Sequence, residues 1–171
     1  LLFVILVIAL TVLTGIPDDE DGPDFYTLML GSTIGMMLMS SANHLLILFV
    51  GVEMTSVPSY VMVGFLKGRK TGSEAALKYV VYGAGAAGVM LYGTSLLAGL
   101  LGTANLPELA SRIVMVAGSD ASLTDPNMRI IAFGSTLVLV GLAFKLSLVP
   151  FHFWCPDAFE GAAAEVAGFL S

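Results

Sequence analysis

The sequence has few charged residues and a single cysteine. Asp, Glu, Lys and Arg make up 12% of its 171 residues, whereas a soluble domain carries about a quarter. Polar stripes at helical spacing, which a soluble helical bundle needs on its outer faces, are also missing. Cys155 alone excludes an internal disulfide and offers no set of metal ligands. No basic tract is present, so we expect no nucleic acid partner.

Apolar residues are abundant instead. They account for 57% of the chain, and several runs reach the roughly 20 residues that cross a bilayer as a helix. This pattern predicts an all-α fold, a polytopic transmembrane helix bundle. It also predicts that the lipid bilayer surrounds most of the chain.

Six apolar segments mark the predicted spans. We interpret residues 1–171 as a fragment of one transmembrane domain, with sequence missing at both ends because the chain opens and closes inside apolar runs. The spans are expected at about 1–16, 25–41, 44–66, 74–101 and 128–154, with the start of another at 161–171. Between the last two complete segments, residues 107–116 predict a short interfacial helix, since proline is favourable in a first helical turn.

The basic residues predict an orientation in the membrane. Lys67, Arg69 and Lys70 lie in a short loop, 67–73, and short basic loops face the cytoplasm. Counting spans places the acidic loop 17–24 on the same side, which the rule permits because it counts Lys and Arg only. The connection 102–127 is then expected on the opposite side.

Two ionisable residues lie deep inside predicted spans, Glu53 and Lys145. Such residues cost about 2.5–3.5 kcal/mol each on insertion scales and usually mark ion or proton pathways. Glu53 lies on the order of 13 Å from the start of its span. Apolar residues precede Lys145 for two turns, too far for its side chain to reach the interface. Pro150 follows and predicts a broken helix, which membrane proteins tolerate where it lines protein or a wet cavity.

Lys78 and His152 are further candidates with two readings each. Lys78 lies one turn after Glu74, so it is either a functional lysine or one half of an ordinary i,i+4 pair. His152 lies about two turns beyond Lys145 and titrates near neutral pH. It either extends a proton path from Lys145 or is a structural residue at the membrane interface. Asp157 is expected to cap the next helix, since anions are favoured at helix starts.

Three blocks of the sequence resemble one known family. HLLILFVGVEMTSVPSYVMVGF, SEAALKYVVYGAGAAGVMLYGTSLL and GLAFKLSLVPFHFWCPDAFEGA are similar to the antiporter-like membrane subunits of proton-pumping NADH–quinone oxidoreductase, respiratory complex I. Within that family the resemblance is closest to subunit N, the counterpart of mitochondrial subunit 2. It covers most of the chain from the second span onward, and the stretch KLSLVPFHFWCPDAFEG is long and specific.

The resemblance implies a proton-translocating subunit of a quinone-reducing enzyme. Glu53 matches the family glutamate, Lys145 the lysine of the broken helix, His152 the histidine of a P-F-H motif and Lys78 a lysine in an S-E-A-x-x-K-Y block. These residues would relay protons, coupled to quinone reduction. The chain itself would carry no cofactor; NADH, flavin, iron–sulfur clusters and quinone would lie on partner membrane and peripheral subunits. The expected location is the bacterial inner membrane.

The sequence departs from the family pattern in one place, after His152. The family motif P-D-x-Y-x-G-A-P-x-P becomes PDAFEGAAAE, with Phe159 for tyrosine and Ala163 and Glu165 for two prolines.

Three other functions are compatible with the sequence: a subunit of a cation/proton antiporter, a hydrogenase membrane arm, or a scaffold whose buried charges fix helix register. The sequence identifies neither the quinone nor the ion, proton or sodium. It does not establish that Glu53 contacts Lys145.

Overall fold

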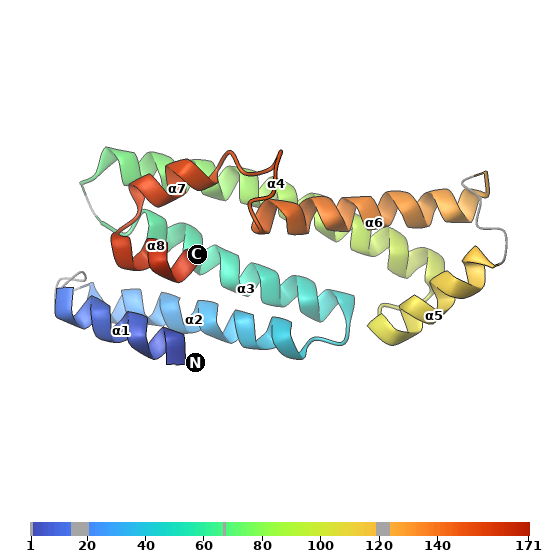
Figure 1. Ribbon diagram of the computed structural model, residues 1–171, viewed down its shortest axis with the longest axis horizontal. Coiled ribbons are helices and arrows are strands. Elements are labelled where there is room, and N and C mark those ends of the chain that lie inside the picture. The colour runs from blue at the N-terminus through green and yellow to red at the C-terminus, as the bar shows by residue number, and fades with distance from the viewer. Residues whose placement is uncertain (1, 15–20, 67, 119–123) are drawn as a thin grey trace.

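The computed structural model of the chain is an elongated helical bundle (Figure 1). It describes residues 2–14, 21–66, 68–118 and 124–171. In this part of the chain the helices are α1 (Leu2–Thr14), α2 (Gly22–Ser41), α3 (Leu45–Val63), α4 (Lys70–Leu101), α5 (Leu106–Ala117), α6 (Pro126–Lys145), α7 (Cys155–Gly161) and α8 (Ala164–Leu170). The all-α prediction is confirmed. The acidic loop predicted at 17–24 lies largely outside the described residues.

Two antiparallel helix pairs form the body of the bundle. α2 packs along α3 and α4 packs along α6, and α3 joins the pairs by packing on α4 (Figure 1). Both pairs rely on glycine at the closest approach. A Cβ on Gly35 would lie 2.6 Å from the Thr55 nitrogen, and a Cβ on Gly93 would lie 2.6 Å from the Gly134 oxygen. Small residues at these positions let the helix backbones come together.

We expect Gly93→Ala to weaken the α4–α6 pair. The added methyl meets the backbone of Gly134, and overpacking of this kind costs about 1–3 kcal/mol. The matched control is Gly85→Ala on the same helix, where a Cβ meets nothing within 4 Å. The measurement is the yield of assembled protein after detergent extraction. Equal yields for the two variants would contradict the prediction.

Three helices are long and apolar enough to cross a membrane, among the residues described. They are α3, α4 and α6, and Val4–Leu13 is a shorter apolar helical stretch. These helices correspond to the spans predicted at 44–66, 74–101 and 128–154. The helix predicted at 107–116 is present as α5, with Asn105 as its N-cap and Pro107 in its first turn.

The predicted basic loop 67–73 is shorter in the structure than in the prediction. α4 begins at Lys70, and the Ser73 amide already donates a helical hydrogen bond to the Arg69 carbonyl at 3.2 Å. A helix can continue through polar residues whose side chains reach water. The prediction from apolar residues alone therefore placed the start of α4 too late. Lys67 lies outside the described residues.

The helix of the predicted span 128–154 breaks near Pro150, as predicted, and it ends at Lys145. α6 stops at Lys145, residues 146–154 follow an irregular path with a cis Val149–Pro150 bond, and α7 occupies part of the expected loop. In a helix, the ring of Pro150 would clash with the carbonyl four positions earlier, so α6 does not continue through this proline. The last segment also starts later than predicted, at Ala164. The break therefore begins directly at Lys145.

A backbone clasp closes the end of the bundle opposite α7 and α8. The Leu45 amide donates to the Ala104 carbonyl at 2.8 Å, and the Leu106 amide donates to the Asn43 carbonyl at 3.0 Å. These bonds join the α2–α3 turn to the α4–α5 connection. Apolar side chains from α3, α4, α5 and α6 pack beside the clasp: Leu45, Leu97, Leu101, Leu109 and Ile131.

Candidate functional site

Lys145 is the last residue of α6, where the free carbonyls of the helix end attract a cation. Its Nζ lies 3.3 Å from Glu53 Oε1 on α3. It also donates to Ser56 Oγ at 2.6 Å and to Tyr60 Oη at 2.9 Å. The Lys145 and Glu53 side chains are 14% and 24% exposed. The contact that the sequence left open is therefore present in the structure.

One face of α3 supplies all three partners of the lysine. Glu53, Ser56 and Tyr60 are spaced by three and four residues, which places them on the same side of a helix. The Ser56 hydroxyl also donates to the Val52 carbonyl at 2.7 Å, which fixes its orientation. Gly83 of α4 lies directly against the Tyr60 hydroxyl, where a Cβ would collide with it. The α3–α4 contact thus holds the tyrosine toward Lys145.

Glu53 depends on Lys145 for compensation of its charge. Its Oε1 atom is buried and, among the described residues, accepts no hydrogen bond of good geometry. Removing one partner of a buried pair leaves an uncompensated charge, at a cost of about 3–5 kcal/mol. The two side chains therefore act as a unit.

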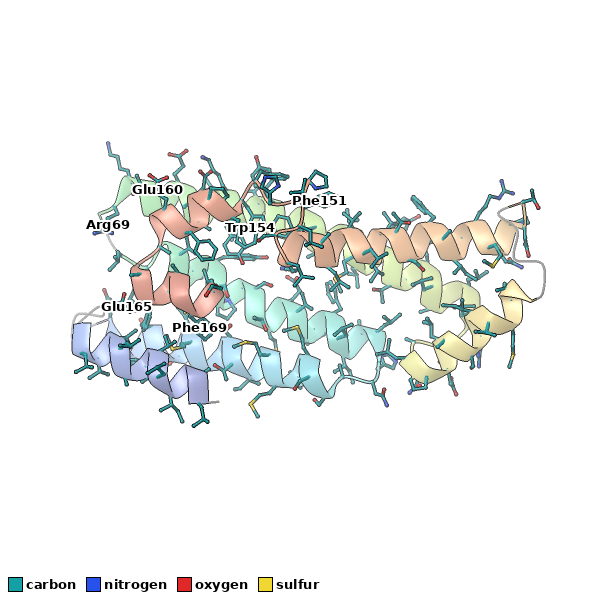
Figure 2. All side chains as sticks on the ribbon, viewed as in Figure 1. Arg69, Phe151, Trp154, Glu160, Glu165 and Phe169 are labelled. Carbon is teal, nitrogen blue, oxygen red and sulfur yellow. The ribbon has the colours of Figure 1, made fainter. Side chains whose placement is uncertain are left out.

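Four aromatic side chains form a wall around the lysine, which we call the aromatic wall: Tyr60, Tyr79, Phe144 and Trp154. Lys145 Nζ lies 5.4 Å from the Tyr60 ring centre and 6.0 Å from that of Phe144, within reach of cation–π attraction. Trp154 lies at the break between α6 and α7 (Figure 2). Its Nε1 donates to the Phe144 carbonyl at 3.0 Å, so the irregular segment is fastened to the end of α6.

A cavity of about 440 Å³ borders the lysine. Its polar lining includes the hydroxyls of Ser32, Thr55, Ser56 and Ser59, and α8 contributes Phe169 (Figure 2). Water needs both space and polar partners, with about 30 Å³ of liquid volume per molecule, and this cavity offers both. A titratable pair beside such a space is suited to exchanging protons with water.

Lys78 lies apart from this cluster. Its Nζ is 2.9 Å from Glu74 Oε1 and 2.9 Å from Asp157 Oδ2. The pairing with Glu74 was one of the two readings from sequence, and it is confirmed. The pairing with Asp157, in the first turn of α7, was missed because it joins segments far apart in the chain.

His152 is exposed, within the irregular segment after α6. The structure gives its ring no hydrogen bond or ion pair among the described residues, and it does not line the cavity beside Lys145. Of the four predicted site residues, Glu53 and Lys145 are thus brought together, and Lys78 and His152 lie outside their contacts.

Sequence reasoning also missed Ser56, Tyr60 and Trp154. A signal existed for the first two, since they share the helical face of Glu53. Trp154 carried no signal, because its role depends on the path of the chain after Lys145.

The chain resembles known respiratory membrane proteins. NADH-quinone oxidoreductase subunit N 1 of Koribacter versatilis is 43% identical over 154 residues, which cover 90% of this chain and 29% of that protein. Respiratory complex I from Thermus thermophilus contains a chain with 38% identity and a TM-score of 0.69, over 85% of this chain and 30% of that one. The archaeal membrane-bound sulfane sulfur reductase gives 26% identity and a TM-score of 0.78, over 97% of this chain and 32% of its counterpart.

This chain therefore spans less than a third of the length of these proteins. The sequence pattern of one transmembrane family, described as NADH:quinone oxidoreductase/Mrp antiporter, matches residues 42–171. That match covers most of the chain and confirms the resemblance found in the three sequence blocks. The chain belongs to the NADH:quinone oxidoreductase/Mrp antiporter family of transmembrane proteins.

Proposed function

We propose that this chain is part of a proton-translocating membrane subunit of an NADH–quinone oxidoreductase. The observation that carries the proposal is the Glu53–Lys145 pair, with Nζ and Oε1 3.3 Å apart at the broken end of α6. The similarity to proteins named as subunit N supports it. The cavity beside Lys145 supplies room for water next to the pair.

In the proposed mechanism the charge on Glu53 controls whether Lys145 holds its proton. An ionised Glu53 stabilises the Lys145 ammonium by attraction. When Glu53 is neutralised or moves away, burial favours the neutral amine, and the lysine releases its proton into the adjacent cavity. His152, exposed beyond the break, is the proposed next acceptor, reached through water. The redox reaction in partner subunits would drive the cycle by changing the separation or the charge of the Glu53–Lys145 pair.

The proposal assigns redox chemistry to partner subunits. NADH, flavin, iron–sulfur clusters and quinone would be held there, and this chain would carry protons only. It would lie in the bacterial inner membrane with the segment 67–73 facing the cytoplasm, as the positive-inside rule predicts.

The direct experiment uses the purified complex in liposomes. Addition of NADH and quinone is expected to drive proton translocation, followed with a pH-sensitive dye, and the rate is expected to be the same with and without sodium. The family name also covers Mrp antiporters, which makes cation/proton exchange the second candidate. Exchange of sodium for protons in the absence of NADH would contradict the proposal and support that alternative.

We expect Tyr60→Phe to slow proton pumping without loss of assembly. The change keeps the ring and removes the hydroxyl that accepts from Lys145 Nζ at 2.9 Å. Hydrogen bonds to charged groups contribute about 1.5–3 kcal/mol, and Ser56 remains as a partner, so a reduction of roughly tenfold is the expected scale. Tyr92→Phe, at an exposed tyrosine of α4, is the matched control. Equal pumping by the two variants would remove Tyr60 from the mechanism.

A further inference from the structure

We propose that the Lys78–Asp157 ion pair positions Lys145, and that it acts through α7 and the side chain of Trp154. Lys78 is in this view a positioning residue and not a proton carrier. The inference rests on the proposed function of Lys145. Its basis is a continuous set of contacts from the ion pair to the lysine.

The first step is the attachment of α7 to α4. Lys78 Nζ, on α4, donates to Asp157 Oδ2 at 2.9 Å, in the first turn of α7. At the other end of α7, a Cβ on Gly161 would lie 2.6 Å from the Ala75 Cβ, so the two helices are in close contact there as well. The ion pair therefore fixes the beginning of α7 and the glycine contact fixes its end.

The second step is the coupling of α7 to Trp154. This residue is the N-cap of α7, one turn before Asp157, so it moves with the start of the helix. The Trp154 side chain is 5% exposed. Its ring stacks on Tyr79 of α4, with centres 4.1 Å apart and planes 1° from parallel. A shift of Asp157 therefore displaces a large buried ring.

The third step joins Trp154 to both sides of Lys145. Its Nε1 donates to the carbonyl of Phe144, the residue before the lysine. Its stacking partner Tyr79 packs edge-on against Tyr60, with ring centres 4.5 Å apart. Tyr60 in turn accepts a hydrogen bond from Lys145 Nζ. Through the aromatic wall, the position of α7 thus affects both the backbone at Phe144 and the Tyr60 hydroxyl that binds Lys145.

Local charge determines the direction of the effect. Glu74 and Asp157 both face Lys78, and Glu160 of α7 (Figure 2) lines the same small cavity as all three. Without the ammonium of Lys78, carboxylates of α4 and α7 would face each other and repel. Loss of Lys78 should therefore push α7 away from α4, whereas loss of Asp157 only releases it.

The test compares charge-keeping and charge-removing variants in the complete complex in liposomes, with protons translocated per NADH as the readout. Lys78→Met is expected to lower this ratio about threefold to fivefold, on the scale of a partly exposed ion pair. Asp157→Asn should lower it less, and Lys78→Arg should retain it. Trp154→Phe, which removes the Nε1 donor, should lower it too, and combined with Lys78→Met it should lower it no further.

The matched control is Lys70→Met on α4, which is expected to keep the normal ratio. Loss of pumping in Lys78→Arg would overturn the inference, because arginine keeps the ion pair and fails only as a proton carrier. Independent, multiplying effects of Lys78→Met and Trp154→Phe would overturn it as well. So would reduced assembly of Lys78→Met with a normal ratio in the assembled fraction.

Lys145→Ala separates this inference from the proposed function. If Lys145→Ala pumps normally, the proposed function fails. If it does not pump while Lys78→Met and Trp154→Phe pump normally, only the positioning role fails.

Discussion

Lys145→Ala is expected to abolish NADH-driven proton pumping in the assembled complex. The variant removes the titratable group at the broken end of α6, next to the cavity and to Glu53. Positioned acid–base groups contribute about 10²–10⁴-fold to the rate of a proton transfer step, so a loss of at least roughly a hundredfold in pumping rate is expected. The measurement is dye-detected acidification in liposomes, normalised to the amount of complex.

The alanine variant also leaves Glu53 without its counter-ion, so amount and intactness of the complex must be measured beside pumping. Lys145→Arg resolves the ambiguity. Arginine keeps the positive charge at all working pH values and so preserves the attraction to Glu53, but it does not release a proton. We expect Lys145→Arg to assemble and to pump as poorly as Lys145→Ala. Normal pumping by either assembled variant would refute the relay.

Glu53→Gln is expected to have the second largest effect. The amide has nearly the same shape as the carboxylate but never carries the charge that stabilises the Lys145 ammonium at 3.3 Å. Without that charge, burial favours the neutral lysine throughout the cycle, and proton uptake becomes the slow step. A reduction of roughly tenfold or more in pumping rate is expected, since 1.4 kcal/mol of lost stabilisation already gives that factor.

Two controls frame this result. Glu53→Asp retains the charge on a shorter side chain and should keep more activity than Glu53→Gln. Glu108→Gln changes an exposed carboxylate of α5, bonded to Thr103, and should pump normally. If Glu53→Gln also pumps normally, the buried charges serve to fix helix register, as the scaffold reading from sequence holds.

Glu53 and Lys145 could be found from the sequence because the energetic cost of burying an ionisable group in a membrane span can be read from it. Glu53 and Lys145 are ionisable groups inside apolar runs, and no knowledge of the fold is needed to see that they are expensive. The three longest spans could be found for the same reason, since apolar length alone marks them. The break after α6 was predictable from Pro150, but the residue at which the helix ends was not, because the apolar pattern continues to Trp154.

The contacts of the site could not be predicted, because they depend on how the chain turns after Lys145. Asp157 looked like a helix cap, and it does lie in the first turn of α7, but its partner Lys78 is on another helix. Trp154 looked like one more apolar residue near a span end. Its stacking on Tyr79 exists only because the irregular segment leads it back onto α4.

The backbone clasp at the opposite end of the bundle has a consequence for the Glu53–Lys145 distance. There the α2–α3 turn and the α4–α5 connection share paired hydrogen bonds and an apolar cluster, so sliding or separation of the two helix pairs at that end would break these contacts. A scissor-like opening of the two helix pairs, with its pivot at the clasp, would keep these contacts intact. In such a motion displacement grows with distance from the pivot, so a small angular change becomes a larger gap at Lys145.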